Sequence, residues 1–84
     1  MIGSKVTRET ILQIIAGHAL NVLPELSNHV FRPDDRLADL GANSVDRAEI
    51  VMSTLSSLSL RIPLVDTLQA KNIGELANLL HDKL

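Results

Sequence analysis

The sequence has no cysteine, no tryptophan and no tyrosine, and Phe31 is its single aromatic residue. The lack of cysteine excludes a disulfide framework, a thiolate metal site and a cysteine nucleophile. The core must be built from Leu, Ile, Val, Ala and Met, and the rings on which single-stranded bases stack are missing. Eight Lys and Arg against ten Asp and Glu give a net charge of −2. This balance argues against nucleic acid as the main partner.

Long apolar runs and targeting signals are absent from the sequence as well. No segment approaches the roughly 20 apolar residues that cross a bilayer. The residues that lead up to Lys5 are not followed by the apolar region of a signal peptide. Ile2 stands where N-myristoylation requires glycine. We therefore expect a cytoplasmic protein with no membrane partner.

The composition fits one small folded domain over residues 1–84. A chain of 84 residues leaves no room for a second domain. Its 45% hydrophobic and 21% charged residues predict a folded chain and not a disordered one. Because so small a domain buries little, we expect neither a deep catalytic cavity nor an enzyme.

Three stretches show apolar residues at three- and four-residue steps, the period of an α-helix. They run over about 5–23, 44–59 and 72–83, and Ser4, Asn43 and Asn72 are the expected N-caps. Their apolar faces are predicted to be Val6, Ile11, Ile14, Ile15, Ala19 and Val22; Val45, Ala48, Met52 and Leu55, widened by Val51 and Leu58; and Ile73, Leu76, Ala77, Leu80 and Leu84.

The connection over residues 24–43 has no regular period and holds prolines, aspartates and a glycine. We expect Phe31, Leu37 and Leu40 to pin this long loop to the helices. A short helical piece is predicted over about 64–68. The fold class is therefore all-α: three longer helices and one short helix, with a long loop between the first two. No alternation long enough for a strand is present.

The titratable residues form no catalytic or metal-binding pattern. No histidine stands four residues from another ligand on a predicted helix, so we expect structural histidines and no metal site. Asp34 and Asp35 open a turn, and Asp46 and Glu49 are typical of a solvated helix face. The three histidines are His18, His29 and His81.

Ser44 stands out because it follows a glycine-containing turn and opens a predicted helix. One interpretation is a plain helix start, capped by Asn43 or Ser44. The other is a modification site, since the free N–H groups and the positive dipole end of a helix favour an attached phosphate. No base lies nearby in sequence to activate the Ser44 hydroxyl. If the serine reacts, another protein must supply that activation.

Residues 39–46, Asp-Leu-Gly-Ala-Asn-Ser-Val-Asp, resemble the Asp-Leu-Gly-(Ala/hydrophobic)-Asp-Ser-Leu-Asp signature of acyl carrier proteins. Residues 48–52 resemble the Val-Glu-Leu-Val-Met run of that family, and residues 61–63 resemble its Glu-Ile-Pro. Residues 73–76 fall where the last helix of the family begins. The resemblance covers nearly the whole chain.

The resemblance implies a right-handed four-helix bundle in which Ser44 carries 4′-phosphopantetheine. A phosphopantetheinyl transferase would transfer this group from coenzyme A with Mg²⁺. The terminal thiol would then hold an acyl group as a thioester. The implied role is that of a substrate carrier and not an enzyme.

The chain departs from the family pattern at two places near Ser44. Asn43 replaces the usual Asp, which removes one charge beside the serine. The second helix carries uncharged Leu and Ser where the family is acidic, so electrostatic steering of partners should be weak. Met52 is open to either a core or a docking role. The expected partner-docking residues are Asn43, Val45, Asp46, Arg47, Glu49 and Met52.

Residues 41–50 are most similar to the discrete donor carriers of polyketide β-branching cassettes. That resemblance implies a malonyl group that a decarboxylating ketosynthase-like protein converts to acetyl for an HMG-synthase-like enzyme. Acceptor carriers in such systems typically bear a tryptophan, which this chain lacks. The other expected partners are a phosphopantetheinyl transferase and an acyltransferase, and we expect a monomer.

Two other interpretations stay open. One is a carrier for fatty-acid synthesis or for an ordinary polyketide or peptide synthase. The other is a structural or adaptor helical domain, in which Ser44 only caps a helix.

Overall fold

The computed structural model describes residues 6–84, and every regular element in that range is helical. Three α-helices are joined by two short 3₁₀ turns, so the predicted all-α class is confirmed. The expected fourth helix is only the second of these turns. In chain order the elements are α1 (Arg8–Val22), η1 (Pro24–Asn28), α2 (Ser44–Ser57), η2 (Leu64–Thr67) and α3 (Ile73–Asp82).

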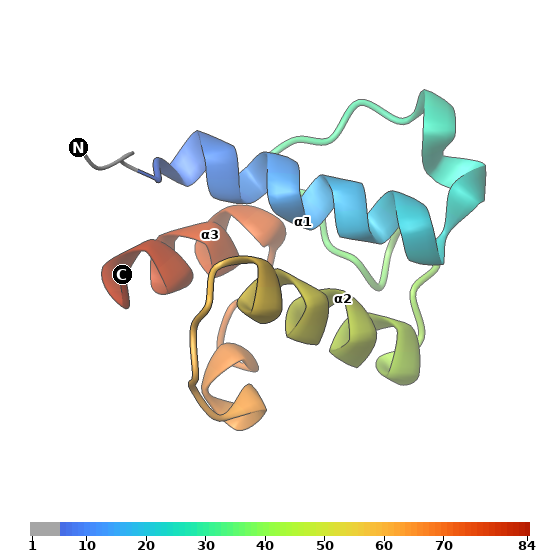
Figure 1. Cartoon of the computed structure of the whole chain (residues 1–84). Helices are drawn as coiled ribbons and strands as arrows, with labels where there is room; N and C mark the ends of the chain where they lie inside the picture. The colour runs from blue at the N-terminus through green and yellow to red at the C-terminus, as the bar shows by residue number, and fades with distance from the viewer. Residues whose placement is uncertain (1–5) are drawn as a thin grey trace.

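Helix α1 lies across the other two α-helices and packs against both, while η2 packs against α2 (Figure 1). Aliphatic side chains from all three helices meet in one core, which the loop residues Leu37 and Ala42 also enter. Among residues 6–84, no helix has the length and apolar content to cross a membrane. The largest fully buried apolar side chains are Ile11, Ile15, Ile50, Ile73 and Leu80.

Helix α1 begins later than predicted. Its N-cap is Thr7, whose hydroxyl accepts a 3.1 Å hydrogen bond from the Thr10 N–H. This bond satisfies one of the free donors of the first turn, so the helix starts at Arg8. Ser4, the predicted cap, lies outside the described residues, as does Lys5.

The predicted apolar stripe of α2 is wrong in part. Val45 and Met52 are 72% and 57% exposed. The face that packs against the core is Ile50, Val51, Thr54 and Leu55, of which Val51 and Leu55 were predicted. Periodicity missed Ile50 because apolar residues occur on more than one side of α2, and it missed Thr54 because threonine is polar. The buried Thr54 hydroxyl donates a 2.8 Å hydrogen bond to the Ile50 carbonyl of its own helix.

Two other predicted boundaries in this half of the chain shift by a residue or two. Helix α2 ends at Ser57 and not at Ser59, which has a φ of 54° and so cannot continue a right-handed helix. The short piece predicted over 64–68 is the 3₁₀ turn η2, which stops at Thr67.

Helix α3 is capped by Asn72 as predicted, since its side-chain oxygen accepts a 2.7 Å hydrogen bond from the Glu75 N–H. The helix ends at Asp82, and Leu84, predicted to lie on its apolar face, is 55% exposed. The long loop packs onto the core as predicted, with Leu37 buried and Phe31 and Leu40 half-buried. It also contains the 3₁₀ turn η1, which the irregular sequence pattern did not indicate.

Candidate functional site

A tight turn presents Ser44 at the start of α2. Gly41 has a φ of 107°, a backbone conformation that favours glycine. The next residue, Ala42, is buried, and its N–H donates a 3.0 Å hydrogen bond to the Leu37 carbonyl. Because Ala42 is anchored in the core, the chain leaves the turn in a fixed direction and α2 begins at the surface.

Asn43 and Asp46 form a reciprocal cap around Ser44. The Asn43 side-chain oxygen accepts a 2.8 Å hydrogen bond from the Asp46 N–H, and the Asp46 carboxylate accepts one of 3.1 Å from the Asn43 N–H. The predicted cap is therefore confirmed, and it is Asn43, not Ser44. Ser44 is the first residue of α2 and is exposed.

The first turn of α2 can receive a negatively charged group. The helix itself supplies no acceptor for the N–H groups of Ser44 and Val45, and the helix dipole places partial positive charge at the same point. A phosphate ester on the Ser44 hydroxyl would lie next to these donors. The exposed hydroxyl, the donors and the dipole together fit a phosphate-linked group.

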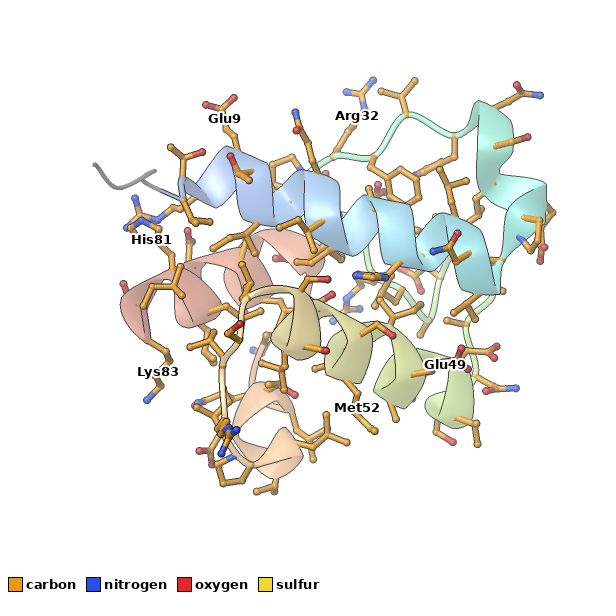
Figure 2. The ribbon with its side chains drawn as sticks, viewed as in Figure 1. Glu9, Arg32, Glu49, Met52, His81 and Lys83 are labelled. Carbon is orange, nitrogen blue, oxygen red and sulfur yellow. The ribbon has the colours of Figure 1, made fainter. Side chains whose placement is uncertain are left out.

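The predicted docking residues lie on α2 and at its start, but they differ in exposure. Asn43, Val45, Glu49 and Met52 are exposed, whereas Asp46 and Arg47 are half-buried. Figure 2 shows Met52 projecting from the side of α2 that is turned away from α1. The Arg47 Nη1 donates a 2.8 Å hydrogen bond to the Ala42 carbonyl, which draws this side chain toward the loop.

Two of the three histidines form side-chain hydrogen bonds. The His18 Nε2 lies 2.8 Å from the Ser57 hydroxyl and so links α1 to α2. The His29 Nε2 lies 2.8 Å from the Asp35 Oδ2 within the long loop. His81 lies half-buried in the last turn of α3. Over residues 6–84, no three His, Asp or Glu side chains gather as metal ligands would.

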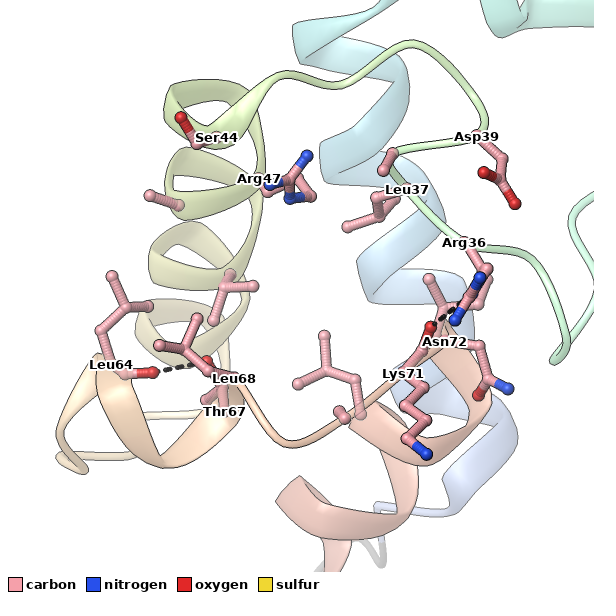
Figure 3. A pocket seen from close by; sticks show the side chains of 16 residues that line it. Arg36, Leu37, Asp39, Ser44, Arg47, Leu64, Thr67, Leu68, Lys71 and Asn72 are labelled. Carbon is pink, nitrogen blue, oxygen red and sulfur yellow. Dashed lines mark hydrogen bonds between the residues drawn. The ribbon is translucent and has the colours of Figure 1, made fainter.

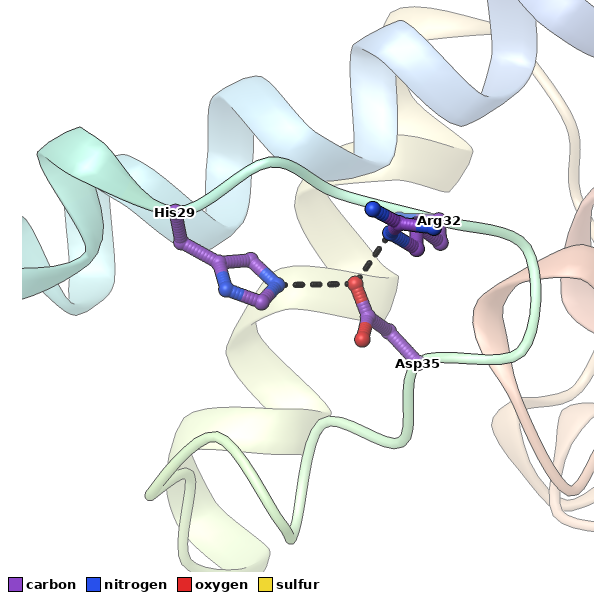
Figure 4. A network of polar contacts seen from close by, with 3 residues as sticks. All are labelled: His29, Arg32 and Asp35. Atoms are coloured by element: carbon purple, nitrogen blue, oxygen red, sulfur yellow. Dashed lines mark hydrogen bonds and ion pairs between the residues drawn. The ribbon is translucent and has the colours of Figure 1, made fainter.

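The His29–Asp35 pair organises the middle of the long loop (Figure 4). The same Asp35 oxygen also accepts a 2.8 Å hydrogen bond from the Arg32 N–H. Burial of the Asp35 carboxyl acts to raise its pKa, but these two hydrogen bonds and the charges of His29 and Arg32 outweigh it and lower the pKa below 3.8. The ring of His29 also meets Phe31 edge-on, with centroids 4.8 Å apart.

A cavity of about 430 Å³ opens beside Ser44, between α2, η2, the start of α3 and the loop (Figure 3). Aliphatic side chains form much of its wall. Sequence reasoning missed the basic residues of this cavity, Arg36 and Lys71, because they are 35 positions apart in the chain. The apolar wall includes Leu37, Val51, Leu64, Leu68, Ile73 and Leu76.

The chain is similar to proteins of known family and structure. The family model described as "Phosphopantetheine attachment site" matches residues 9–80. The polyketide biosynthesis acyl-carrier protein AcpK of Bacillus subtilis (strain 168) is 48% identical over 77 residues, 92% of this chain and 94% of that protein. A chain from the crystal structure of the curacin biosynthetic pathway HMG synthase in complex with acetyl donor-ACP is 44% identical. It matches with a TM-score of 0.88 over 92% of this chain and 99% of its own length.

The family match spans most of the chain, and the AcpK match covers nearly all of both sequences. The protein therefore belongs to the acyl carrier family, whose members bear phosphopantetheine, and is a carrier and not a catalyst.

Proposed function

We propose that Ser44 is the residue to which phosphopantetheine is attached. It opens α2 in the position that the family signature gives to the modified serine, and its exposed hydroxyl lies beside two free N–H donors. When bound, the group supplies a flexible arm whose thiol carries an acyl group as a thioester. The chain's own part is to hold the phosphate end at α2 and to offer a cavity beside it.

We further propose that this carrier serves polyketide β-branching as the donor of a malonyl-derived acetyl group to an HMG-synthase-like enzyme. The observation that carries this proposal is the likeness to a chain from the complex of an HMG synthase with an acetyl donor-ACP, at a TM-score of 0.88 and 44% identity. The likeness to AcpK, a polyketide acyl-carrier protein, supports the same pathway class.

The exposed apolar side chains of α2 are consistent with a dedicated partner. Val45 and Met52 are exposed and lie seven residues apart, so they project from the same side of the helix. We propose that these two side chains, together with Asn43, Asp46 and Glu49, contact the synthase. An apolar contact of this kind depends on shape complementarity more than on long-range attraction.

The first test is mass spectrometry of the intact protein after incubation with coenzyme A, Mg²⁺ and a phosphopantetheinyl transferase. We expect a gain of one phosphopantetheine on the native chain and none on Ser44→Ala. Ser56→Ala, which removes another exposed serine of α2, is the matched control and should gain the group. A gain on Ser44→Ala would contradict the assignment of the serine.

The second test loads the modified protein with acetyl and offers it to an HMG-synthase-like enzyme and, separately, to a fatty-acid ketosynthase. Acetyl transfer to the first enzyme but not to the second is the expected result. The reverse preference would instead assign the protein to fatty-acid or ordinary polyketide synthesis.

A further inference from the structure

The cavity beside Ser44 is basic, although the whole chain carries a net charge of −2. Its lining includes the cations Arg36, Arg47 and Lys71 but only one anion, Asp39. Three of the eight Lys and Arg thus line the cavity, against one of the ten Asp and Glu. Positive charge gathered in a hollow of an acidic protein attracts small anions to that place.

The three cations reach the cavity from three separate segments. Arg47 lies on α2 close to Ser44, where its bond to the Ala42 carbonyl holds it. Arg36 lies on the long loop and donates from Nε to the Lys71 carbonyl at 3.3 Å, and its two terminal nitrogens are further donors. Figure 3 shows Ser44 and Arg47 on one side of the hollow and Arg36 and Lys71 on the other.

These cations have no direct carboxylate partner in the described part of the chain. The ion pair found within residues 6–84 is that of His29 and Asp35, neither of which lines the cavity. Asp39 lines the cavity but forms no ion pair with Arg36. The charge of the cavity is therefore available to a bound anion.

Most of the other lining residues are apolar, among them Leu37, Val51 and Leu64. The polar ones are Ser44, Thr67 and Asn72. The site thus combines a surface for a short hydrocarbon stem with cations for a charged tip. A guanidinium binds a carboxylate through two parallel N–H donors, which gives direction as well as attraction. A neutral acyl group would meet the same walls but would leave these donors unused.

We propose that this cavity retains acyl groups that end in a carboxylate, such as malonyl, through Arg36, Arg47 and Lys71. The proposal rests on the proposed function, because the acyl group reaches the cavity on an arm attached to Ser44. An acetyl group has no carboxylate, is not retained in this way and stays available to a partner. The cavity then distinguishes a charged acyl group from a neutral one on the same carrier.

The phosphodiester of the arm is a second source of negative charge. It is fixed to the Ser44 hydroxyl beside the N–H groups of α2, whereas Arg36 and Lys71 lie across the hollow (Figure 3). We therefore assign these two cations to the carboxylate. A form with the arm but without an acyl group carries the phosphodiester alone and tells the two sources apart.

The test compares the protein bearing the bare arm, malonyl, or acetoacetyl, which matches malonyl in shape but is neutral. A ¹³C label on the malonyl carboxylate lets NMR follow its pKa. We expect this pKa to be about one unit lower than in malonyl-pantetheine, since a nearby guanidinium lowers a carboxyl pKa by roughly one to three units. The Nε signals of Arg36 and Arg47 should shift with malonyl but not with acetoacetyl.

Charge-removing variants locate the effect. Lys71→Gln is the cleanest, because the hydrogen bonds formed by Lys71 use its backbone. Arg36→Gln and Arg47→Gln also remove side-chain bonds, so their circular dichroism is compared with that of the native protein. Each variant should move the malonyl pKa back toward that of malonyl-pantetheine. Arg61→Gln removes an exposed cation that does not line the cavity and should leave the pKa unchanged.

Two results would overturn this proposal while the proposed function stands. One is a malonyl pKa equal to that of malonyl-pantetheine on a protein that mass spectrometry shows to be loaded. The other is a shift of the Arg36 signal with the bare arm that malonyl does not enlarge, which would assign Arg36 to the phosphodiester. If no arm can be attached to Ser44, the proposed function and this inference fail together.

Discussion

The backbone N–H of Gly74 donates a 2.8 Å hydrogen bond to the carbonyl oxygen of Pro33. A Cβ atom on Gly74 would lie 2.8 Å from both the Cβ and the carbonyl oxygen of Pro33, so any other residue here would force the two segments apart. Beside this bond, the Ile73 N–H donates at 2.9 Å to the Asp35 carbonyl. These two bonds hold the long loop against the start of α3 and thereby place Arg36 at the cavity.

Gly74→Ala is expected to destabilise the protein. The new methyl group must push the Pro33 backbone away, and overpacking of this kind costs roughly 1–3 kcal/mol. The better helix propensity of alanine offsets up to about 1 kcal/mol of that loss. Gly17→Ala is the matched control: nothing lies within 4 Å of its added Cβ, so it should stabilise α1. Urea unfolding measures the stability of both variants. Equal changes in the two would show that Pro33 moves away from the new methyl group without cost.

Asp35 makes stability fall in acid. Its pKa is lowered in the folded protein, so its stabilisation is fully present above 3.8 and is lost as the pH falls through the lower folded pKa. Asp35→Asn should cost about 1 kcal/mol at neutral pH, below the usual loss for a hydrogen bond to a charged group, because the pair is partly exposed. Unfolding in urea across pH 2–7 checks this, with Asp34→Asn as the exposed control. If the free energy of unfolding of both variants falls in acid as it does for the native protein, the Asp35 hydrogen bonds do not cause the acid dependence.

Val45→Glu and Met52→Glu separate docking from stability. Both side chains are exposed, so each variant should change the free energy of unfolding by less than about 0.5 kcal/mol. Burying the new carboxylate at an apolar contact with the synthase is unfavourable. If it costs more than about 1.4 kcal/mol of binding free energy, acetyl transfer to the synthase should fall at least about tenfold. Val30→Glu, an equally exposed valine on the long loop, should transfer at the native rate. Unchanged transfer by all three would remove α2 from the interface.

Local sequence signals predicted the parts of this fold that depend on neighbours in the chain. Asn43 and Asn72 were identified as helix caps because a cap bonds to a residue three positions away. The apolar faces of α1 and α3 were largely correct, since both follow a helical period. The position of Ser44 on the first turn of α2 follows from the same local signal.

Features that depend on distant contacts were not predictable in this way. The cavity is basic because Arg36 and Lys71 meet across 35 positions of sequence. On α2, apolar residues occur on more than one side, and only contact with α1 decides that Ile50 is buried while Met52 is exposed. The Pro33–Gly74 contact is likewise set by tertiary packing, and no local sequence pattern predicts it.

Asn43→Asp tests how the residue before Ser44 affects modification. Aspartate caps a helix as well as asparagine does and suits the helix dipole. The Asp46 carboxylate that already bonds to this cap repels it, so the free energy of unfolding should stay within about 0.5 kcal/mol of native. A broad-specificity transferase should add phosphopantetheine several-fold faster, because a charge at a docking rim changes mainly the association rate. Asn28→Asp, the same change on exposed η1, should not alter the rate in a mass-spectrometric time course. Equal modification rates for the native protein and Asn43→Asp would mean that the charge at position 43 does not affect recognition by the transferase.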